Sequence, residues 1–233
     1  MKMNFDNQTT AQGHSKPIWD YSLNLQFLSH INPDFGVELG VWKGSTFQII
    51  EKYCKKAIGF DNHKWTTFGE YKHLWEKSWD IREMDIQKID KNDFGGKDIN
   101  FAHVDASKEF SKVIKELEII RDNLHADGII CIADYITHRD VFTATQYFLR
   151  ENREFNIKVN GYNQVYLVKS GGADLIEDTI SRFDEKIVKS LKLESTYSVN
   201  MIPKNFKTDI DFAIMTQENV SEDLKKFYKD FNR

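Results

Sequence analysis

Residues 37–46 read VELGVWKGST, and this stretch decides the fold because an apolar segment runs straight into a turn that carries two glycines. Residues 35–39 have the length and the apolar composition of a short strand. Residues 45–55 carry a helical pattern, and residues 57–60 form a second short strand that ends at Asp61. A strand, a glycine turn, a helix and a second strand within about 30 residues make a βαβ unit, whose two strands are parallel.

The same alternation of strands and helices continues along the chain. Further strands are predicted at 79–84, 99–104 and 128–132, and further helices at 65–79, 108–124 and 138–152. Residues 128–132 are continuously apolar, as expected of a central strand in a parallel sheet. Strands at 156–159 and 164–168 flank an Asn-Gly pair, which favours a tight reversal and therefore an antiparallel last strand. We predict an α/β fold with a doubly wound, mostly parallel, Rossmann-like sheet.

The chain is expected to divide into three parts. Residues 1–16 are polar and without periodicity, so we expect a mobile tail. Residues 17–170 hold the α/β domain, which starts with a short amphipathic helix at 17–30. Residues 171–233 form a C-terminal extension with two amphipathic patterns, which can cap a site, extend the core or form a dimer face. The pattern at 176–191 makes a homodimer reasonable.

Composition and charge exclude several classes of protein. The 233 residues include 32 Lys and Arg against 36 Asp and Glu, a formal charge of −4, which argues against a binder of duplex nucleic acid. The apolar runs are only a few residues long, so no membrane association is expected. The polar N-terminus does not resemble a secretory signal, and Cys54 and Cys131 lie in no metal-binding pattern. We therefore expect a cytoplasmic protein.

Two common nucleotide-binding loops do not fit the glycine turn. A dinucleotide-binding fingerprint needs glycines two and five positions after Gly40, where this chain has Trp42 and Ser45. A phosphate-binding P-loop needs Gly-Lys-Ser or Gly-Lys-Thr, whereas residues 43–45 read Lys-Gly-Ser. The spacing that is present is Glu38, a glycine two positions later, and a second glycine four positions after that.

Glu38, Gly40 and Gly44 resemble motif I of class I S-adenosylmethionine-dependent methyltransferases. The resemblance implies that Asp61 binds the two ribose hydroxyls of the cofactor, because a carboxylate accepts from both O–H donors. Residues 85–86, Asp-Ile, resemble the pair that contacts the adenine ring in that family. The expected cofactor-binding residues are Glu38, Gly40, Trp42, Gly44, Ser45, Asp61, Asp85, Ile86 and Asp105.

Three motifs narrow the resemblance to the small-molecule O-methyltransferases typified by macrocin O-methyltransferase. The motifs are ELGVWKG at 38–44, HVD at 103–105 and ICIADY at 130–135. The resemblance covers about residues 35–170 and does not reach the C-terminal extension. In that family the carboxylates at the positions of Asp105 and Asp134 bind a divalent cation, usually Mg²⁺. Such a cation can bind vicinal hydroxyls and lower the pKa of the one to be methylated.

The chain departs from this family at two positions. Ala133 stands where a further metal-binding acid is expected, and Ser107 replaces the second acid of an Asp-x-Asp motif. Two carboxylates would hold Mg²⁺ more weakly, and without metal a general base must take the proton. His138 is the candidate base, although a solvent-facing histidine at a helix start fits its position equally well. The expected catalytic residues are Asp105, Asp134 and His138, and His103 is interpreted as a core histidine.

These expectations leave three functional hypotheses. The first is transfer of a methyl group from S-adenosylmethionine to a hydroxyl of a small molecule, plausibly a sugar of a glycan or a secondary metabolite. The second is a small-molecule N-methyltransferase, which needs neither a metal nor a strong base. The third is a cofactor-binding or regulatory protein that has the fold without catalysis.

Overall fold

The computed structural model describes residues 24, 27–62, 77–135, 137–161 and 164–169, together with 175, 178, 179, 181, 182, 200 and 201. The predicted tail at 1–16, nearly all of the predicted helix at 65–79 and most of the extension at 171–233 lie outside the described residues. Of the predicted helix at 17–30, residues 24 and 27–30 are described, and they are helical.

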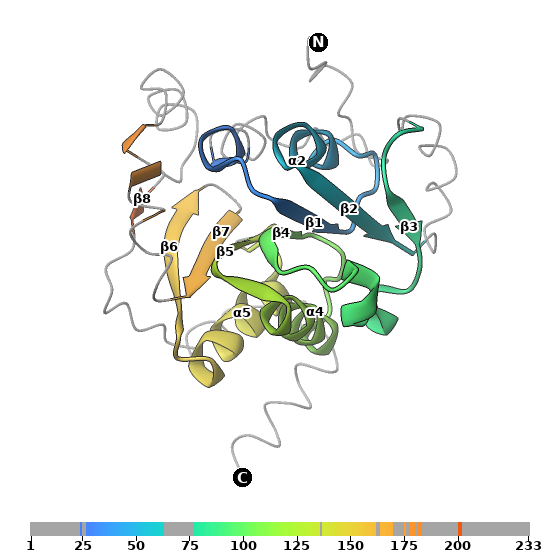
Figure 1. The fold of residues 1–233 in the computed structure, drawn as a ribbon. Helices are drawn as coiled ribbons and strands as arrows, with labels where there is room; N and C mark the ends of the chain where they lie inside the picture. Colours follow the sequence, from blue (N-terminus) through green and yellow to red (C-terminus); the bar gives the residue numbers. More distant parts are fainter. Residues whose placement is uncertain are drawn as a thin grey trace.

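An eight-stranded sheet forms the centre of the fold, with the order β3-β2-β1-β4-β5-β7-β6-β8 (Figure 1). The strands from β3 to β5 are parallel, and β7, β6 and β8 are antiparallel to their neighbours. The strands are β1 Phe35–Leu39, β2 Lys56–Asp61, β3 Ile81–Glu83, β4 Ile99–Val104, β5 Leu124–Ile132, β6 Phe155–Gly161, β7 Gln164–Lys169 and β8 Asn200–Met201. The mostly parallel α/β sheet with an antiparallel end is therefore confirmed.

Helices cover both faces of the sheet (Figure 1). Helices α4 (Phe110–Asp122) and α5 (Arg139–Glu151) lie together on one face, and α2 (Phe47–Tyr53) lies on the other. Two short 3₁₀ helices, η3 (Ile86–Lys88) and η4 (Lys91–Phe94), connect β3 to β4. Among the described residues, no helix has both the length and the apolar composition that crossing a bilayer requires.

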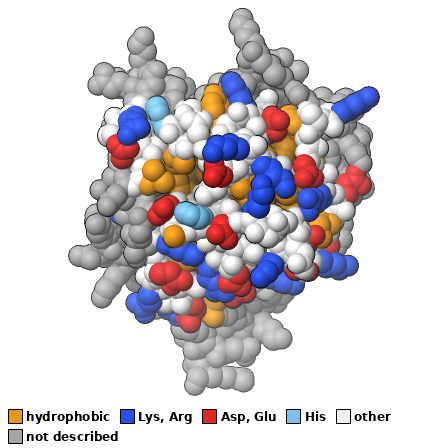
Figure 2. Space-filling view, in the orientation of Figure 1, with side chains coloured by type: hydrophobic (Ala, Val, Ile, Leu, Met, Phe, Trp, Pro, Cys, Tyr) orange, Lys and Arg blue, Asp and Glu red, His pale blue; other side chains and the backbone are white. Residues whose placement is uncertain are grey.

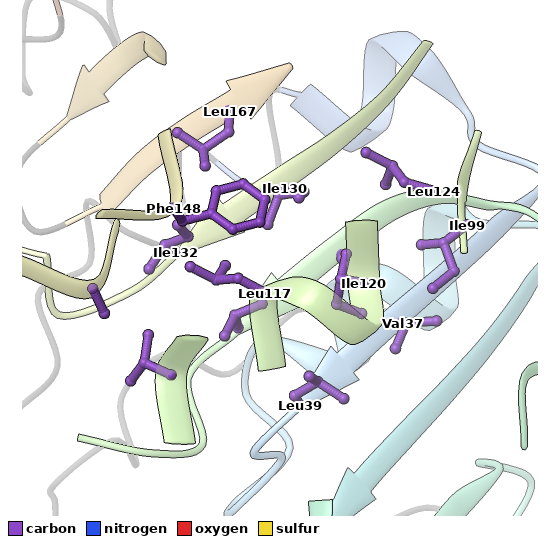
Figure 3. Close-up of a cluster of buried hydrophobic side chains, with 14 of the residues drawn as sticks. Val37, Leu39, Ile99, Leu117, Ile120, Leu124, Ile130, Ile132, Phe148 and Leu167 are labelled. Carbon is purple, nitrogen blue, oxygen red and sulfur yellow. The ribbon is translucent and has the colours of Figure 1, made fainter. Parts of the chain in front are cut away.

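The main core lies between the sheet and the pair α4 and α5 (Figure 3). Alternate residues of each strand point to this side, so Val37 and Leu39 of β1 face it while Glu38 faces the other side. Leu117 of α4 and Phe148 of α5 pack onto the strands with less than 2% of their surface exposed. Burial of these apolar side chains stabilises the layered arrangement.

Most elements begin and end within two residues of the predicted bounds, whereas β5 and the C-terminal extension differ more. Strand β5 begins at Leu124 instead of residue 128, because Leu124 pairs with Ile99 before the register of the two strands shifts. His125 and Asp127 interrupt the apolar pattern, so a hydropathy pattern does not show this start. The C-terminal extension also contributes β8, which pairs with β6 and was not predicted, while the strand expected at 211–215 lies outside the described residues.

Asp140 joins the two helices that cover the main core. Its buried carboxylate accepts a hydrogen bond from the backbone N–H of Phe110 at 3.1 Å, at the first residue of α4. The four N–H groups that begin a helix have no partner within it, so a carboxylate at this place satisfies a donor that would otherwise be buried.

Replacing Asp140 by Ala should therefore cost about 1–2 kcal/mol in the free energy of unfolding. Urea denaturation followed by circular dichroism measures this cost. Glu109→Ala is the matched control, because Glu109 precedes the same helix and its carboxylate is exposed and paired with Lys112. The control should cost less than about 0.5 kcal/mol. Equal costs for the two variants would contradict the capping role of Asp140.

Candidate active site

The residues that follow the central parallel strands are held together at one edge of the sheet. The backbone N–H of Gly40 donates to the carbonyl of Phe60 at 2.8 Å, and that of Asp105 donates to Leu39 at 2.9 Å. One strand further, Ala133 donates to Val104 at 3.0 Å. Ligands of open α/β sheets bind outside the carboxyl ends of the strands, so this edge is the candidate site.

The glycine turn after β1 has a backbone that side chains rarely allow. Gly40 has a φ of +90° and Gly44 a φ of +79°. A Cβ atom at Gly40 would lie 2.7 Å from the backbone N and Cα of Ala106, which is closer than real Cβ contacts allow. Trp42 also has a positive φ, +45°, although it carries a side chain. The turn is therefore bent sharply against the backbone that follows β4.

Asp61, at the end of β2, joins this turn to the strand by a hydrogen bond. Its Oδ2 accepts a hydrogen bond from the backbone N–H of Trp42 at 2.7 Å, and its Oδ1 accepts one from Asn62 at 2.7 Å. The residue is only 6% exposed. Each carboxylate oxygen has two lone pairs, so Asp61 can accept further hydrogen bonds. Beside it, the ammonium of Lys43 lies 4.6 Å from the centre of the Trp42 ring, and partial burial lowers the pKa of Lys43.

Three other residues that were expected to bind the cofactor make contacts within the protein. Ser45 lies half-buried at the end of the turn, where its carbonyl accepts from the side chain of Gln48. Asp85 accepts from the backbone N–H of Gln87 at 3.1 Å and thereby caps η3. Ile86 is 3% exposed and belongs to the main core. Contact of Asp85 and Ile86 with an adenine ring stays a prediction.

Glu38 and His103 form a buried pair on the side of the sheet opposite α4 and α5. The two residues pair in register between β1 and β4, and Oε1 of Glu38 lies 3.0 Å from Nδ1 of His103. Both side chains are at most 2% exposed. The interpretation of His103 as a core histidine is confirmed by this burial, and Glu38 shares it.

A chain of polar groups continues from His103 to the N-terminal helix. Nε2 of His103 lies 3.4 Å from the side-chain nitrogen of Gln164. The side-chain oxygen of Gln164 accepts a hydrogen bond from the Tyr166 hydroxyl at 3.0 Å. The same hydroxyl lies 3.0 Å from the side-chain oxygen of Asn24. Sequence reasoning missed Gln164 and Tyr166, because only the pairing of β5 with β7 brings this strand near β4. It also missed Asn24, whose contact with Tyr166 depends on packing between distant parts of the chain.

Lys108 lies between the two carboxylates that were expected to bind metal. Its ammonium is 2.6 Å from Oδ1 of Asp105 and 2.7 Å from Oδ2 of Asp134. Burial opposes the charged form of this lysine, but the two carboxylates outweigh that effect, and together they raise the pKa of Lys108. The structure therefore brings Asp105 and Asp134 together, as predicted, around a cation that sequence reasoning had missed.

Asp134 and His138 are close to each other without a hydrogen bond between their side chains. Nε2 of His138 lies 3.9 Å from Oδ2 of Asp134, and the imidazole is 47% exposed at the start of α5. Asp134 itself has a φ of +60°, a left-handed conformation that costs energy in a residue with a side chain. Such strain is frequent at functional sites, where it aims a side chain in a direction that regular structure would not allow.

The residues present at this edge do not fit a divalent cation. The two carboxylates already enclose the Lys108 ammonium, and residues 107 and 133 are Ser and Ala. Within the described part of the chain, no group of three or more His, Cys, Asp or Glu side chains could hold a metal ion. The set of ligands that hard cations require is therefore not assembled here, and the expectation of Mg²⁺ finds no support.

Glu116 of α4 is a buried acid next to this edge, and it was not predicted. Its Oε1 accepts from the side chain of Gln87 at 3.2 Å and its Oε2 from the backbone N–H of Ser107 at 3.4 Å. Burial raises the pKa of Glu116 from 4.5 to about 7. Glu116 thus connects η3 to the loop that carries Asp105 and Lys108.

A raised pKa in the folded state makes stability depend on pH. The ionised form of Glu116 is disfavoured in the folded state. The contribution of Glu116 to the free energy of unfolding is therefore largest below pH 4.5 and falls as pH rises towards 7. Glu116→Gln, which mimics the protonated acid, should remove this loss. Relative to the wild type, the variant should gain on the order of 1–3 kcal/mol between pH 5 and pH 7.5. Urea denaturation across this range measures the difference, and a constant difference would contradict the raised pKa.

Comparison with known proteins places the fold. No family model and no curated protein matches the sequence. Among solved structures, a protein of Staphylococcus aureus described as a caffeoyl-CoA O-methyltransferase is similar, with a TM-score of 0.54 and 14% identity over 66% of this chain and 84% of that one. An O-methyltransferase of Bacillus cereus in complex with S-adenosylhomocysteine has a TM-score of 0.51 and 9% identity over 68% of this chain and 83% of that one.

A third similar structure is an rRNA methylase of Streptococcus thermophilus, with a TM-score of 0.50 and 17% identity over 63% of this chain and 94% of that one. The chain therefore has the fold of class I methyltransferases. Because the names of these similar proteins cover different acceptors, the fold alone does not identify the acceptor.

Proposed function

We propose that this protein is an S-adenosylmethionine-dependent methyltransferase whose acceptor is a hydroxyl group of a small molecule. The observation that carries the proposal is the joining of the glycine turn to Asp61 at the edge of the sheet where Asp105 and Asp134 also lie. A ligand that spans this edge would meet the turn at one end and the two carboxylates at the other.

The glycine turn and Asp61 have the chemistry to hold the cofactor. Asp61 is oriented by two backbone N–H groups and can still accept from the two ribose hydroxyls. Gly40 lets the turn pack against the backbone of Ala106, because a side chain at this position would clash with it. When bound, S-adenosylmethionine supplies an electrophilic methyl group on a sulfonium sulfur. Similarity to a structure that contains S-adenosylhomocysteine supports this choice of cofactor.

The acceptor chemistry is assigned to the other end of the same edge. His138 would take the hydroxyl proton at Nε2, and Asp134, 3.9 Å away, would stabilise the imidazolium that forms. Asp105 and Asp134 can accept hydrogen bonds from neighbouring hydroxyls of a sugar-like acceptor. Holding the acceptor oxygen in line with the methyl group would supply much of the rate.

The mixed charges on the surface favour a small molecule over a nucleic acid as the acceptor. Figure 2 shows Lys and Arg interspersed with Asp and Glu over the described part of this face, and the whole chain has a formal charge of −4. Binding of duplex nucleic acid draws its affinity from clustered positive charge. A sugar hydroxyl as the acceptor rests on the motif resemblance, and a cytoplasmic location and a homodimer remain predictions.

Binding of S-adenosylhomocysteine tests the cofactor assignment. Isothermal titration calorimetry should give a dissociation constant in the micromolar range, on the order of −7 to −8 kcal/mol. Asp61→Ala should weaken binding at least tenfold, because it removes the ribose acceptor and releases the turn at Trp42. Asp90→Ala is the control, since Asp90 caps η4 and belongs to no part of the site. Unchanged binding in Asp61→Ala would overturn the assignment.

Turnover tests the catalytic assignment. Release of S-adenosylhomocysteine from S-adenosylmethionine is measured with a panel of nucleotide sugars, catechols and small amines. His138→Ala and Asp134→Asn should each lower turnover about 10²- to 10⁴-fold, the usual contribution of a positioned base, and leave cofactor binding intact. Arg139→Ala, next to His138 on α5, is the matched control. Full activity in both variants would refute the roles of His138 and Asp134.

The same two experiments distinguish the alternatives. Cofactor binding without turnover on any hydroxyl or amine acceptor would indicate a regulatory protein on the same fold. Turnover restricted to amines and insensitive to His138→Ala would indicate an N-methyltransferase.

A further inference from the structure

We propose that the ammonium of Lys108 is the resident cation of the active site and occupies the place that a divalent metal would take between Asp105 and Asp134. This inference rests on the proposed function and deepens it, because it names the group that holds the two carboxylates together and makes the site independent of metal.

The geometry of Lys108 is that of a bridging cation. Its Nζ contacts one oxygen of Asp105 at 2.6 Å and one of Asp134 at 2.7 Å, and both are the short distances of charge-assisted hydrogen bonds. Asp105 follows β4 and Asp134 follows β5, so the lysine joins the ends of two neighbouring strands. A metal ion between these oxygens would have to displace the ammonium.

The residues near Lys108 also agree with an ammonium in the place of a metal ion. A hard divalent cation needs about six oxygen ligands, several of them carboxylates. Ser107 and Ala133 stand at the two positions where further acids were expected, and among the described residues two carboxylates, those of Asp105 and Asp134, contact the Lys108 ammonium. A single positive charge needs fewer ligands than a divalent ion, and two carboxylates around one ammonium leave a net charge of only −1.

Lys108 also has a donor to offer to a ligand. An ammonium has three N–H groups, and two of them bond the carboxylates. Nζ also lies 3.4 Å from the main-chain carbonyl oxygen of Asp105, a long contact that a better acceptor can replace. The side chain is 30% exposed, so an acceptor oxygen can reach it. Lys108 is therefore a positioning residue that orients both carboxylates and can hold the acceptor.

Binding of Mn²⁺ tests the proposal without relying on activity. Room-temperature electron paramagnetic resonance of added MnCl₂ measures the free ion, and the wild type should take up no Mn²⁺ at this site at ion concentrations up to about 1 mM. Lys108→Met keeps the aliphatic stem and removes the charge, which leaves Asp105 and Asp134 facing each other. A divalent cation would relieve their repulsion, so the variant should bind Mn²⁺ at least tenfold more tightly than the wild type.

Two further variants make this result specific. Lys108→Met combined with Asp134→Asn should lose the added affinity, because only one carboxylate remains at the site. Lys112→Met removes a lysine four residues further along that pairs with Glu109, and it should behave as the wild type. Lys108→Ala serves as a second variant if the methionine variant does not fold, as judged by circular dichroism.

The proposal is overturned if the wild type binds Mn²⁺ as tightly as the Lys108 variants, or if no Lys108 variant gains affinity. Titration of the same proteins with S-adenosylhomocysteine separates this failure from that of the proposed function. Lack of S-adenosylhomocysteine binding by the wild type would refute the methyltransferase assignment, whatever the Mn²⁺ result. Normal S-adenosylhomocysteine binding with tight Mn²⁺ binding by the wild type would refute only the role of Lys108.

Discussion

The close approach of two backbone segments at the edge of the sheet is the constraint on which the candidate site depends. The turn after β1 passes so near the backbone after β4 that a Cβ atom at Gly40 would lie 2.7 Å from Ala106. This contact places the glycine turn beside the loop that carries Asp105 and Lys108. A side chain at Gly40 would separate the glycine turn from the loop that carries Asp105 and Lys108.

The strands and their mostly parallel arrangement could be predicted because hydrophobic burial gives parallel strands a local pattern. Residues 35–39, 57–60 and 99–104 are short apolar runs, and each is a strand of the sheet. The positions of Asp61, Asp105 and Asp134 at strand ends followed directly from those runs. The start of β5 and the pairing of β8 could not be predicted in this way, because both depend on contacts between distant parts of the chain.

The sequence predicts where the carboxylates of the candidate site lie, but it does not predict which groups pair with them. A carboxylate at the end of a strand indicates a ligand site, but the partner that neutralises it is set by three-dimensional contacts. Lys108 is close to Asp105 in sequence, and lysines in such positions are usually solvated. Its contact with Asp134 exists because β4 and β5 are neighbours in the sheet. The row from Glu38 through His103 to Gln164 depends on strand pairing in the same way.

Each acidic residue of the candidate site at this edge has a polar or charged partner within the chain. Glu38 contacts His103, Asp61 accepts from two backbone N–H groups, and Asp105 and Asp134 pair with Lys108. Burial of a carboxylate without such partners would cost several kcal/mol or raise its pKa. The pKa of Glu116 is raised by burial even though Gln87 and Ser107 donate hydrogen bonds to its carboxylate. Because the chain supplies each of these partners itself, the edge can keep its carboxylates oriented before any ligand binds. A site prepared in this way loses little free energy to reorganisation on binding, which is the physical advantage of holding these charges in place.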